Sequence, residues 1–280
     1  MAQTYKTLNV DENDNVTTIA MDRPKSNNAW TGRMHMELRA AFAIANQDPA
    51  CAVIVLTGAG ERGFCPGGDF QALEGHAERG SYDDGLTPDV VDPVPDAPAP
   101  FQATLTWMVA LDKPVIAAVN GAAAGVGLAL ACLADIRFGV RGAKMTTAHG
   151  KLNLPAEYGL SWLLPRIVGL GRANDLLLTS RKFTGEEAAQ MGLFNQAFDT
   201  VDELRAHTAA YAADMAITVS PGSLTATKRQ VWLDQTRDLA AAVTESEARL
   251  EHMMTEANYK EGLSALLKRR TPDWLRAKTQ

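Results

Sequence analysis

The sequence lacks the patterns that mark several common classes of enzyme and metal protein. It has no Gly-x-Ser-x-Gly elbow, no His-Glu-x-x-His segment and no paired Cys and His spacing, so neither an esterase-type nucleophile nor a zinc site is indicated. The three cysteines, Cys51, Cys65 and Cys132, form no Cys-x-x-Cys pair and lie in or beside apolar runs, so we expect reduced, packed thiols. The first residues show no basic start followed by an apolar core, and we expect a cytoplasmic protein.

The chain also has fewer basic residues than acidic ones. The chain has 27 Lys and Arg against 33 Asp and Glu, a formal net charge of -6. This balance argues against general binding of nucleic acid, although it leaves room for a local basic pocket for a phosphorylated ligand. With 280 residues, of which 46% are hydrophobic, the chain can bury a large core in one domain and carry a smaller appendage.

The longest uncharged stretch, residues 114–134, has the length of a membrane span. Its pattern is different, because an apolar run at 115–119 leads into Asn120-Gly121, and Gly125 and Gly127 precede a second apolar run. We therefore predict a strand, a glycine turn and a buried helix. The first N–H groups of such a helix lack intrahelical partners and can hold an oxygen that gains negative charge.

A second strand with a glycine-rich turn is predicted upstream. The apolar residues 52–56 are followed by Gly-Ala-Gly-Glu-Arg-Gly at 58–63, and Asp83 lies about twenty residues further on, as in a dinucleotide-binding fingerprint. Residues 64–67, Phe-Cys-Pro-Gly, cannot continue as the helix that this fingerprint requires, because proline and glycine interrupt it. An NAD-dependent oxidoreductase is therefore kept only as an alternative.

Strand and helix patterns alternate over the first 220 residues. Residues 4–10 and 16–21 predict a hairpin with the polar residues 11–15 as its turn. Met34, Leu38 and Phe42 fall on one helical face, and that helix is expected to end at Asp48-Pro49.

Further strands are predicted at 52–56, 115–119, 136–140 and 194–198, each with a helical run nearby. Thr184 and Glu187 have the spacing of a capping box and begin a helix that ends at Met191-Gly192. Repeated strand and helix units of this kind predict a right-handed β/α architecture.

The alternation fails at two places. Residues 71–100 are rich in Asp and Pro and are predicted to form a long irregular loop, either a solvated insertion or a functional segment. After Ser220-Pro221, three helical runs rich in Ala, Leu, Glu and Lys extend to Pro272. We therefore predict a core of residues 1–220 and an α-helical region of residues 221–280.

Two segments together resemble the oxyanion-hole segments of the crotonase family, the enoyl-CoA hydratases and isomerases: GFCPGGDF at 63–70 and KPVIAAVNGAAAGVG at 113–127. The resemblance extends over most of the chain and includes DRPKSNNAW at 22–30, LPRIVG at 164–169, TGEEAAQMGLFN at 184–195 and LLKRRTPDW at 266–274. It implies an α/β fold in which ββα turns wind into a spiral, with C-terminal helices that assemble a homotrimer or a hexamer (dimer of trimers). The loop at 71–100 would then border the acyl pocket and shape substrate choice.

The resemblance also implies where the chemistry takes place. It places the two N–H donors that hold a thioester oxygen at Gly68 and Val126, although Val126 departs from the usual glycine or alanine. The two glutamates of the hydratases are replaced here by Ala129 and His149. Glu157 stands where certain family members, including enoyl-CoA isomerases, carry a single catalytic carboxylate.

These residues leave the reaction open. Isomerisation of 3-enoyl-CoA to 2-enoyl-CoA fits one carboxylate, and hydration with His149 as a second acid–base group is the alternative, as are hydrolysis and decarboxylation through a similar enolate. Glu157 could instead be a surface carboxylate near a helix start, and His149 a hydrogen-bonded packing residue. Because both hydratase glutamates are missing, a non-catalytic binding protein, including an RNA-binding one, is a further alternative.

The expected ligand is coenzyme A as part of the thioester substrate, with no permanently bound cofactor, no metal and no nucleic-acid or membrane partner. The resemblance points to Arg23 and Lys25 as contacts of the CoA moiety and, in the assembled oligomer, to Lys268 or Arg269. Arginine and lysine suit phosphate groups, although solubility is the ordinary role of such exposed cations.

Overall fold

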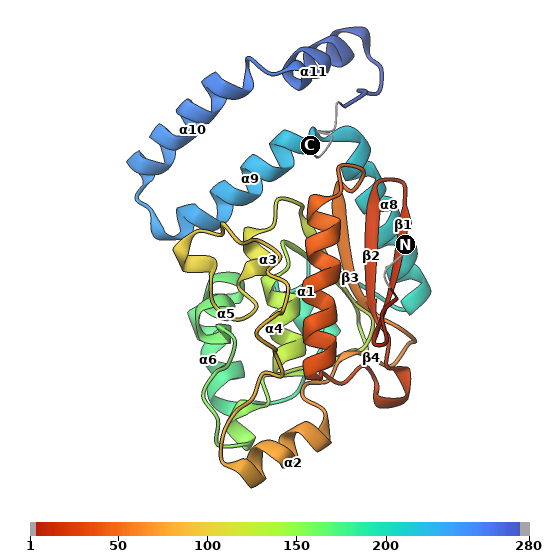
Figure 1. The fold of residues 1–280 in the computed structure, drawn as a ribbon, viewed down its shortest axis with the longest axis vertical. Helices are drawn as coiled ribbons and strands as arrows, with labels where there is room; N and C mark the ends of the chain where they lie inside the picture. Colours follow the sequence, from red (N-terminus) through yellow and green to blue (C-terminus); the bar gives the residue numbers. More distant parts are fainter. Residues whose placement is uncertain (1–3, 275–280) are drawn as a thin grey trace.

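The computed structural model describes residues 4–274 and contains two β-sheets surrounded by helices (Figure 1). The large sheet has the order β1 (Leu8–Asn13), β2 (Val16–Met21), β3 (Val53–Gly58), β5 (Val115–Val119), β7 (Ile136–Val140) and β10 (Gln196–Phe198). The small sheet has the order β4 (Gly63–Cys65), β6 (Ala122–Ala124), β8 (Lys144–Thr146) and β9 (Phe183–Thr184).

The chain alternates between the two sheets. Strands β3, β5 and β7 of the large sheet are each followed directly by β4, β6 and β8 of the small sheet, and then by helices. Neighbours β3, β5 and β7 are parallel, as are β4, β6 and β8. This arrangement confirms the predicted α/β spiral of ββα turns.

Both faces of the large sheet are covered, as expected of parallel strands. Every residue of β3 is buried. Val53 and Val55 pack in the cluster formed with α8 (Val201–Thr218), whereas Ile54 and Leu56 belong to the main core, which includes apolar residues of α1 (Gly32–Gln47). The helix predicted from Met34, Leu38 and Phe42 is thus confirmed as α1.

The hairpin is present, but its predicted turn is wrong. β1 extends to Asn13, so residues 11–13 pair with β2, and the turn consists only of Asp14 and Asn15 with φ of 50° and 64°. Two consecutive positive φ angles are typical of a tight hairpin turn that suits Asp and Asn. The prediction failed because polar residues occupy an edge strand whose end is exposed to solvent.

The uncharged stretch contains the predicted strand, as β5, and the predicted buried helix, as α4 (Val126–Leu133), every residue of which is buried. Between them, where only a glycine turn was predicted, residues 122–124 form the short strand β6. Across residues 4–274, none of the helices combines the length and hydropathy of a membrane span. Residues 63–65 form β4, so the Gly-rich segment at 58–63 leads into a strand where a dinucleotide fingerprint requires a helix.

The three cysteines are free and buried, as predicted. Burial raises the pKa of the Cys65 and Cys132 thiols to about 12. Their thiolate forms are therefore scarce at neutral pH, and the thiols are packing groups rather than nucleophiles.

The segment 71–100 differs from its prediction, because it begins within the helix α2 (Phe70–Arg79). The Asp69 side chain accepts a hydrogen bond from the Gln71 N–H at 3.1 Å, and Gly80, with φ of 63°, ends the helix. α2 buries none of its residues, so it is held by its two caps rather than by burial of an apolar face. Residues 80–98 are irregular, as predicted, up to the short helices η2 (Ala99–Phe101) and α3 (Trp107–Ala110).

The remaining helices of the core follow β8. They are η3 (His149–Lys151), α5 (Leu160–Val168), α6 (Leu170–Thr179) and α7 (Gly185–Gln190). The predicted capping box is confirmed, since Thr184 accepts from the Glu187 N–H and the Glu187 side chain accepts from the Thr184 N–H.

The three predicted C-terminal helices are confirmed as α9 (Pro221–Leu233), α10 (Leu239–Met253) and α11 (Ala257–Lys268). α9 docks on the core, whereas α10 and α11 extend beyond it at the end of the molecule opposite α2 (Figure 1). Within the described chain, Ala265 is the one buried residue of α10 and α11, and several of their apolar side chains are exposed, among them Leu239, Leu250, Leu263, Leu266 and Leu267.

Candidate active site

Three parallel strands bring the predicted site residues to one edge of the small sheet. Because β4, β6 and β8 pair in parallel, the residues that follow them emerge at the same edge. Gly68 follows β4, Val126 follows β6 and His149 follows β8. The fold thus explains how positions far apart in the sequence meet.

The segment after β4 is held by a backbone bridge to Trp30. The Trp30 N–H donates to the Gly67 carbonyl at 2.8 Å, and the Asp69 N–H donates to the Trp30 carbonyl at 2.9 Å. Gly67 has φ of 107°, which requires glycine. Between these two bonds, the Gly68 N–H has no acceptor among residues 4–274.

The second donor stands at the start of a helix pressed against β4. A Cβ at Gly127 would lie 1.9 Å from the Cys65 carbonyl oxygen, so only glycine lets α4 approach this closely. Val126 is the first residue of α4, and its N–H likewise has no acceptor in the described chain. Its side chain packs in the main core. Two donors without partners therefore lie on neighbouring segments, as an oxyanion hole requires.

A carboxylate and a histidine, Glu157 and His149, are both in the segment after β8. Burial raises the pKa of Glu157, while the nearby His149 acts in the opposite direction. His149 is buried, and its ring Nδ1 has no hydrogen-bond partner within residues 4–274. Ala129, in α4, is fully buried and carries no group that could ionise.

The backbone around these two residues is unusual. Ala148, Asn153 and Tyr158 have φ of 62°, 56° and 52°, in the left-handed region that costs non-glycine residues energy. Such conformations concentrate where the surrounding structure fixes functional side chains. Ala148 directly precedes His149, Asn153 lies between His149 and Glu157 in the sequence, and Tyr158 directly follows Glu157.

The predicted CoA contacts are placed unevenly. Arg23 uses its guanidinium on the Ala29 carbonyl and on Asp69, at 2.6 and 3.0 Å, next to Gly68, whereas Lys25 is exposed in η1 (Pro24–Ser26). Lys268 and Arg269 lie at the end of α11. In a single chain, α11 and α2 are at opposite ends of the molecule (Figure 1).

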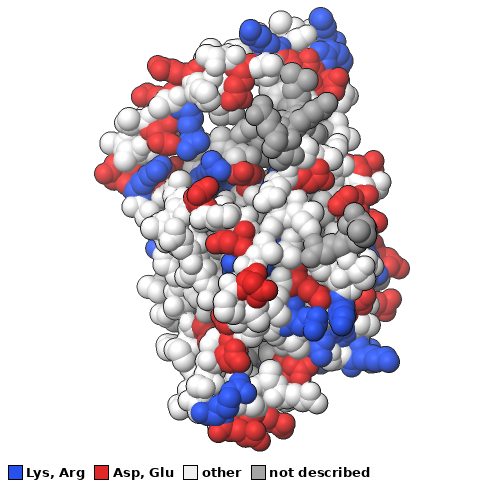
Figure 2. Space-filling view, viewed as in Figure 1, with Lys and Arg blue, Asp and Glu red and all other residues white. Residues whose placement is uncertain are grey.

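Charges of both signs are interspersed on the surface. Among the described residues on the face shown in Figure 2, basic side chains form no continuous stripe and acidic ones lie between them. This face therefore offers no feature that favours RNA binding.

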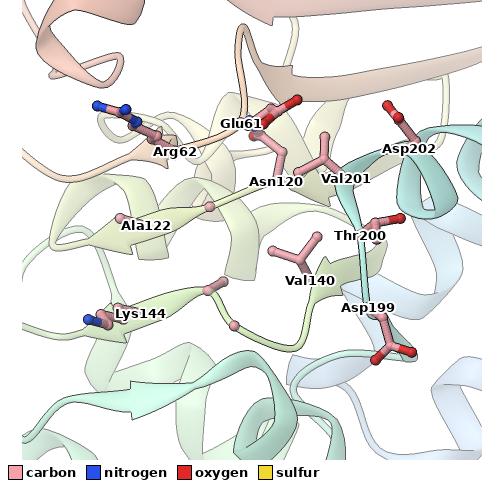
Figure 3. Close-up of a pocket in the computed structure, with 13 residues that line it drawn as sticks. Glu61, Arg62, Asn120, Ala122, Val140, Lys144, Asp199, Thr200, Val201 and Asp202 are labelled. Carbon is pink, nitrogen blue, oxygen red and sulfur yellow. The ribbon is translucent and has the colours of Figure 1, made fainter.

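A cavity of about 650 Å³ lies elsewhere (Figure 3). It adjoins Ala122 and Lys144, the first residues of β6 and β8, and so opens at the edge of the small sheet opposite the donors. Arg62 and Lys144 lie at one end of it, and Asp199 and Asp202 at the other. It is not the site predicted from the sequence.

Two residues of this region that no sequence motif singled out, Tyr82 and Tyr158, have hydroxyl oxygens 2.8 Å apart. No sequence pattern could have paired them, because they are 76 positions apart and neither lies in a regular element.

Comparisons with known proteins point to one family. The sequence profile of the family described as enoyl-CoA hydratase/isomerase matches residues 11–277. The chain is 34% identical over 259 residues to 1,2-epoxyphenylacetyl-CoA isomerase of Escherichia coli (strain K12), covering 92% of this chain and 94% of that protein. It is 35% identical over 269 residues to a probable enoyl-CoA hydratase of Rhodobacter capsulatus, covering 96% and 97%.

A solved structure leads to the same family. A probable enoyl-CoA hydratase/isomerase from Mycobacterium abscessus superposes with a TM-score of 0.83 at 30% identity, over 96% of this chain and 99% of that chain. The profile and the relatives span nearly the whole sequence, and the fold has the expected spiral of ββα turns. This chain therefore belongs to the enoyl-CoA hydratase/isomerase family of enzymes, in the crotonase superfamily.

Proposed function

We propose that this enzyme isomerises a 3-enoyl-CoA thioester to the 2-enoyl-CoA. The observation that carries the proposal is Glu157, a partly buried carboxylate with a raised pKa. It lies in the segment after β8, a neighbour of the strand β6 that precedes Val126. Within residues 4–274, the N–H groups of Gly68 and Val126 have no acceptor. One base and two backbone donors are the groups needed to move a proton beside a thioester carbonyl.

The proposed reaction is a proton transfer from C2 to C4 of the acyl chain. The thioester oxygen accepts hydrogen bonds from the Gly68 and Val126 N–H groups, and Glu157 removes a proton from C2. The electron pair of that C–H bond forms a dienolate whose negative charge is on the thioester oxygen. When the carbonyl re-forms, the double bond shifts to C2–C3 and C4 takes the proton back from Glu157. No water, metal or cofactor is consumed.

Burial gives Glu157 the basicity that this step requires. A carboxylate with a raised pKa binds a proton more tightly than an exposed one and is therefore the stronger base. The positive end of α4 and its N–H groups favour the same negative intermediate.

Hydration of 2-enoyl-CoA is the second candidate. The observation that favours it is His149, whose buried Nδ1 has no partner in the described chain and whose ring is close enough to influence the pKa of Glu157. A histidine and a carboxylate could hold one water molecule between them and divide its proton.

Binding of CoA is proposed to involve Arg23 and Lys25 and, from a neighbouring copy, Lys268 or Arg269. The exposed leucines of α10 and α11 support a homotrimer or a hexamer built through these helices, because isolated chains rarely expose so many apolar side chains together. Residues 1–220 would then form the catalytic core and 221–280 the assembly region of a cytoplasmic enzyme.

Product analysis with 3-enoyl-CoA and, separately, 2-enoyl-CoA tests the reaction. We expect the 3-enoyl substrate to become 2-enoyl-CoA, with kcat about a thousandfold lower in Glu157→Gln and within about tenfold of wild type in His149→Gln. Formation of 3-hydroxyacyl-CoA from 2-enoyl-CoA, abolished in His149→Gln, would replace the isomerase proposal by hydration. Binding of both thioesters without turnover would contradict both reactions.

A further inference from the structure

Two tyrosine hydroxyls form a hydrogen bond next to Glu157. The Oη atoms of Tyr82 and Tyr158 are 2.8 Å apart. Tyr158 directly follows Glu157, and Tyr82 lies in the irregular segment 80–98 after α2. The contact therefore joins this segment to the peptide that carries the proposed base.

The Tyr82 side of this contact is fixed in place. The His76 ring packs edge-on against Tyr82 with centroids 5.3 Å apart, and His76 Nε2 lies 2.9 Å from the Asp83 carbonyl oxygen. A Cβ on Gly85 would lie 2.4 Å from the Gly32 Cα, so the chain here touches the start of α1 backbone to backbone. Part of the segment predicted as a solvated insertion is thus docked on the core, although many of its side chains are exposed.

The Tyr158 side is held in a strained conformation. Its φ of 52° is uncommon for a bulky residue and persists only where neighbours hold it. Tyr158 packs against the main core, and its hydroxyl is bonded to Tyr82. These contacts set the backbone from which the Glu157 side chain extends.

The carboxylates of Glu157, Asp83 and Asp84 are the charged groups that act on the pair. Burial is the largest cause of the raised pKa of both phenols, and the carboxylates of Asp84 and Glu157 raise it further. Both hydroxyls are therefore protonated near neutral pH. They share one hydrogen bond, which leaves one proton for another acceptor.

We propose that Tyr82 and Tyr158 act together as positioning residues that form the outer wall of the site, hold Glu157 in place and keep bulk water from its carboxylate. This inference rests on the proposed function and deepens it, because a shielded carboxylate returns its proton to the acyl chain rather than delivering water to the double bond. Tyr82 as a residue is 60% exposed, which fits a wall with one side toward solvent.

The variants Tyr82→Phe and Tyr158→Phe remove the hydroxyls and keep the rings. Tyr211→Phe, in α8 on the other side of the large sheet, is the matched control. The pKa of Glu157 can be followed by NMR of its carboxyl carbon, whose signal is assigned with Glu157→Gln. We expect this pKa to fall in both variants, because water that reaches the carboxylate reverses its desolvation. In the control the pKa should stay unchanged. An unchanged pKa in both variants would overturn the proposal.

Activity gives a second test. With 3-enoyl-CoA, each variant is expected to lose about tenfold in kcat with KM within about twofold, to form a larger share of 3-hydroxyacyl-CoA, and to lose no more when the two changes are combined. Additive losses, or lower thermal stability with an unchanged product ratio, would contradict the proposal. If the pKa of Glu157 falls but the wild-type enzyme does not isomerise 3-enoyl-CoA, the tyrosine wall stands and the proposed reaction fails.

Discussion

The guanidinium Nη2 of Arg23 lies 3.0 Å from Oδ2 of Asp69, the residue that directly follows Gly68. Its Nη1 also donates to the Ala29 carbonyl at 2.6 Å, on the other side of the bridge between Trp30 and Gly68. Arg23 thus joins both segments that hold Gly68, the first of the two proposed oxyanion donors. Because its guanidinium donates to the Ala29 carbonyl and to Asp69, we expect Arg23 to position Gly68 in addition to contacting CoA.

Replacing Arg23 by glutamine is therefore expected to affect catalysis more than binding. A small displacement of the Gly68 N–H weakens its bond to the oxyanion, so we expect kcat to fall about tenfold while KM changes by about twofold or less. Steady-state kinetics with the isomerase substrate measure both. Lys25→Gln, two residues away in the same loop, is the control: as a proposed CoA contact it should affect KM at most, and it should leave kcat unchanged.

A raised KM with wild-type kcat in Arg23→Gln would contradict this assignment. It would mean that Arg23 serves uniform binding of the CoA moiety and that Gly68 is held well enough without it.

A buried ion pair anchors the first C-terminal helix. Lys228 Nζ lies 2.9 Å from Asp135 Oδ2 and also donates to the carbonyls of Met108 and Lys113, while Trp232 Nε1 donates to Asp135 at 2.8 Å. Asp135 also accepts the Val115 N–H at the start of β5. The network joins α9 to the strands that carry the site.

Lys228→Met is expected to lower the free energy of unfolding by about 3 kcal/mol, because it leaves a mostly buried carboxylate without its cation. Denaturation by urea measures the change. The control is Arg229→Gln, which breaks the exposed pair of Arg229 and Asp112 and should cost about 1 kcal/mol or less. Equal losses in the two variants would show that the buried pair does not hold α9.

The raised pKa of Glu157 has a consequence for stability. Because its folded-state pKa lies above the ordinary value of 4.5, ionisation is harder in the folded state, and the carboxylate destabilises the fold at pH values above both pKa values. Glu157→Gln should therefore be more stable than wild type at neutral pH. The difference should vanish as the pH falls below the ordinary pKa, which thermal unfolding across pH can follow.

Glu186→Gln provides a control of opposite sign. The hydrogen bond from Arg141 lowers the pKa of Glu186, so its carboxylate stabilises the fold above its ordinary pKa and this variant should be less stable than wild type at neutral pH. A stability difference for Glu157→Gln that is independent of pH would contradict the burial of Glu157.

Local signals such as apolar runs and the glycine turn Asn120-Gly121 were sufficient to predict the strands of the large sheet and the β/α alternation. The spiral of ββα turns was expected only from the resemblance to the crotonase family, because the short strands β4, β6 and β8 carry no local pattern of their own. The sequence was not sufficient for α2, which is stabilised by its caps at Asp69 and Gly80 rather than by an apolar face. Nor could it reveal that Lys228 is buried, since a lysine side chain is rarely fully buried in a folded protein. The pair of Tyr82 and Tyr158 depends on a long-range contact that no local pattern encodes.

Following a labelled proton tests directly whether Glu157 carries the proton from C2 to C4. A 3-enoyl-CoA carrying deuterium at C2 is turned over once by excess enzyme in ordinary water, and the product is analysed by mass spectrometry and NMR. If Glu157 alone moves the proton in a shielded site, part of the deuterium removed from C2 appears at C4, and Glu157→Gln forms no such product in the same time. Complete loss of that deuterium to solvent, or transfer that persists in Glu157→Gln, would contradict proton transfer by a shielded Glu157.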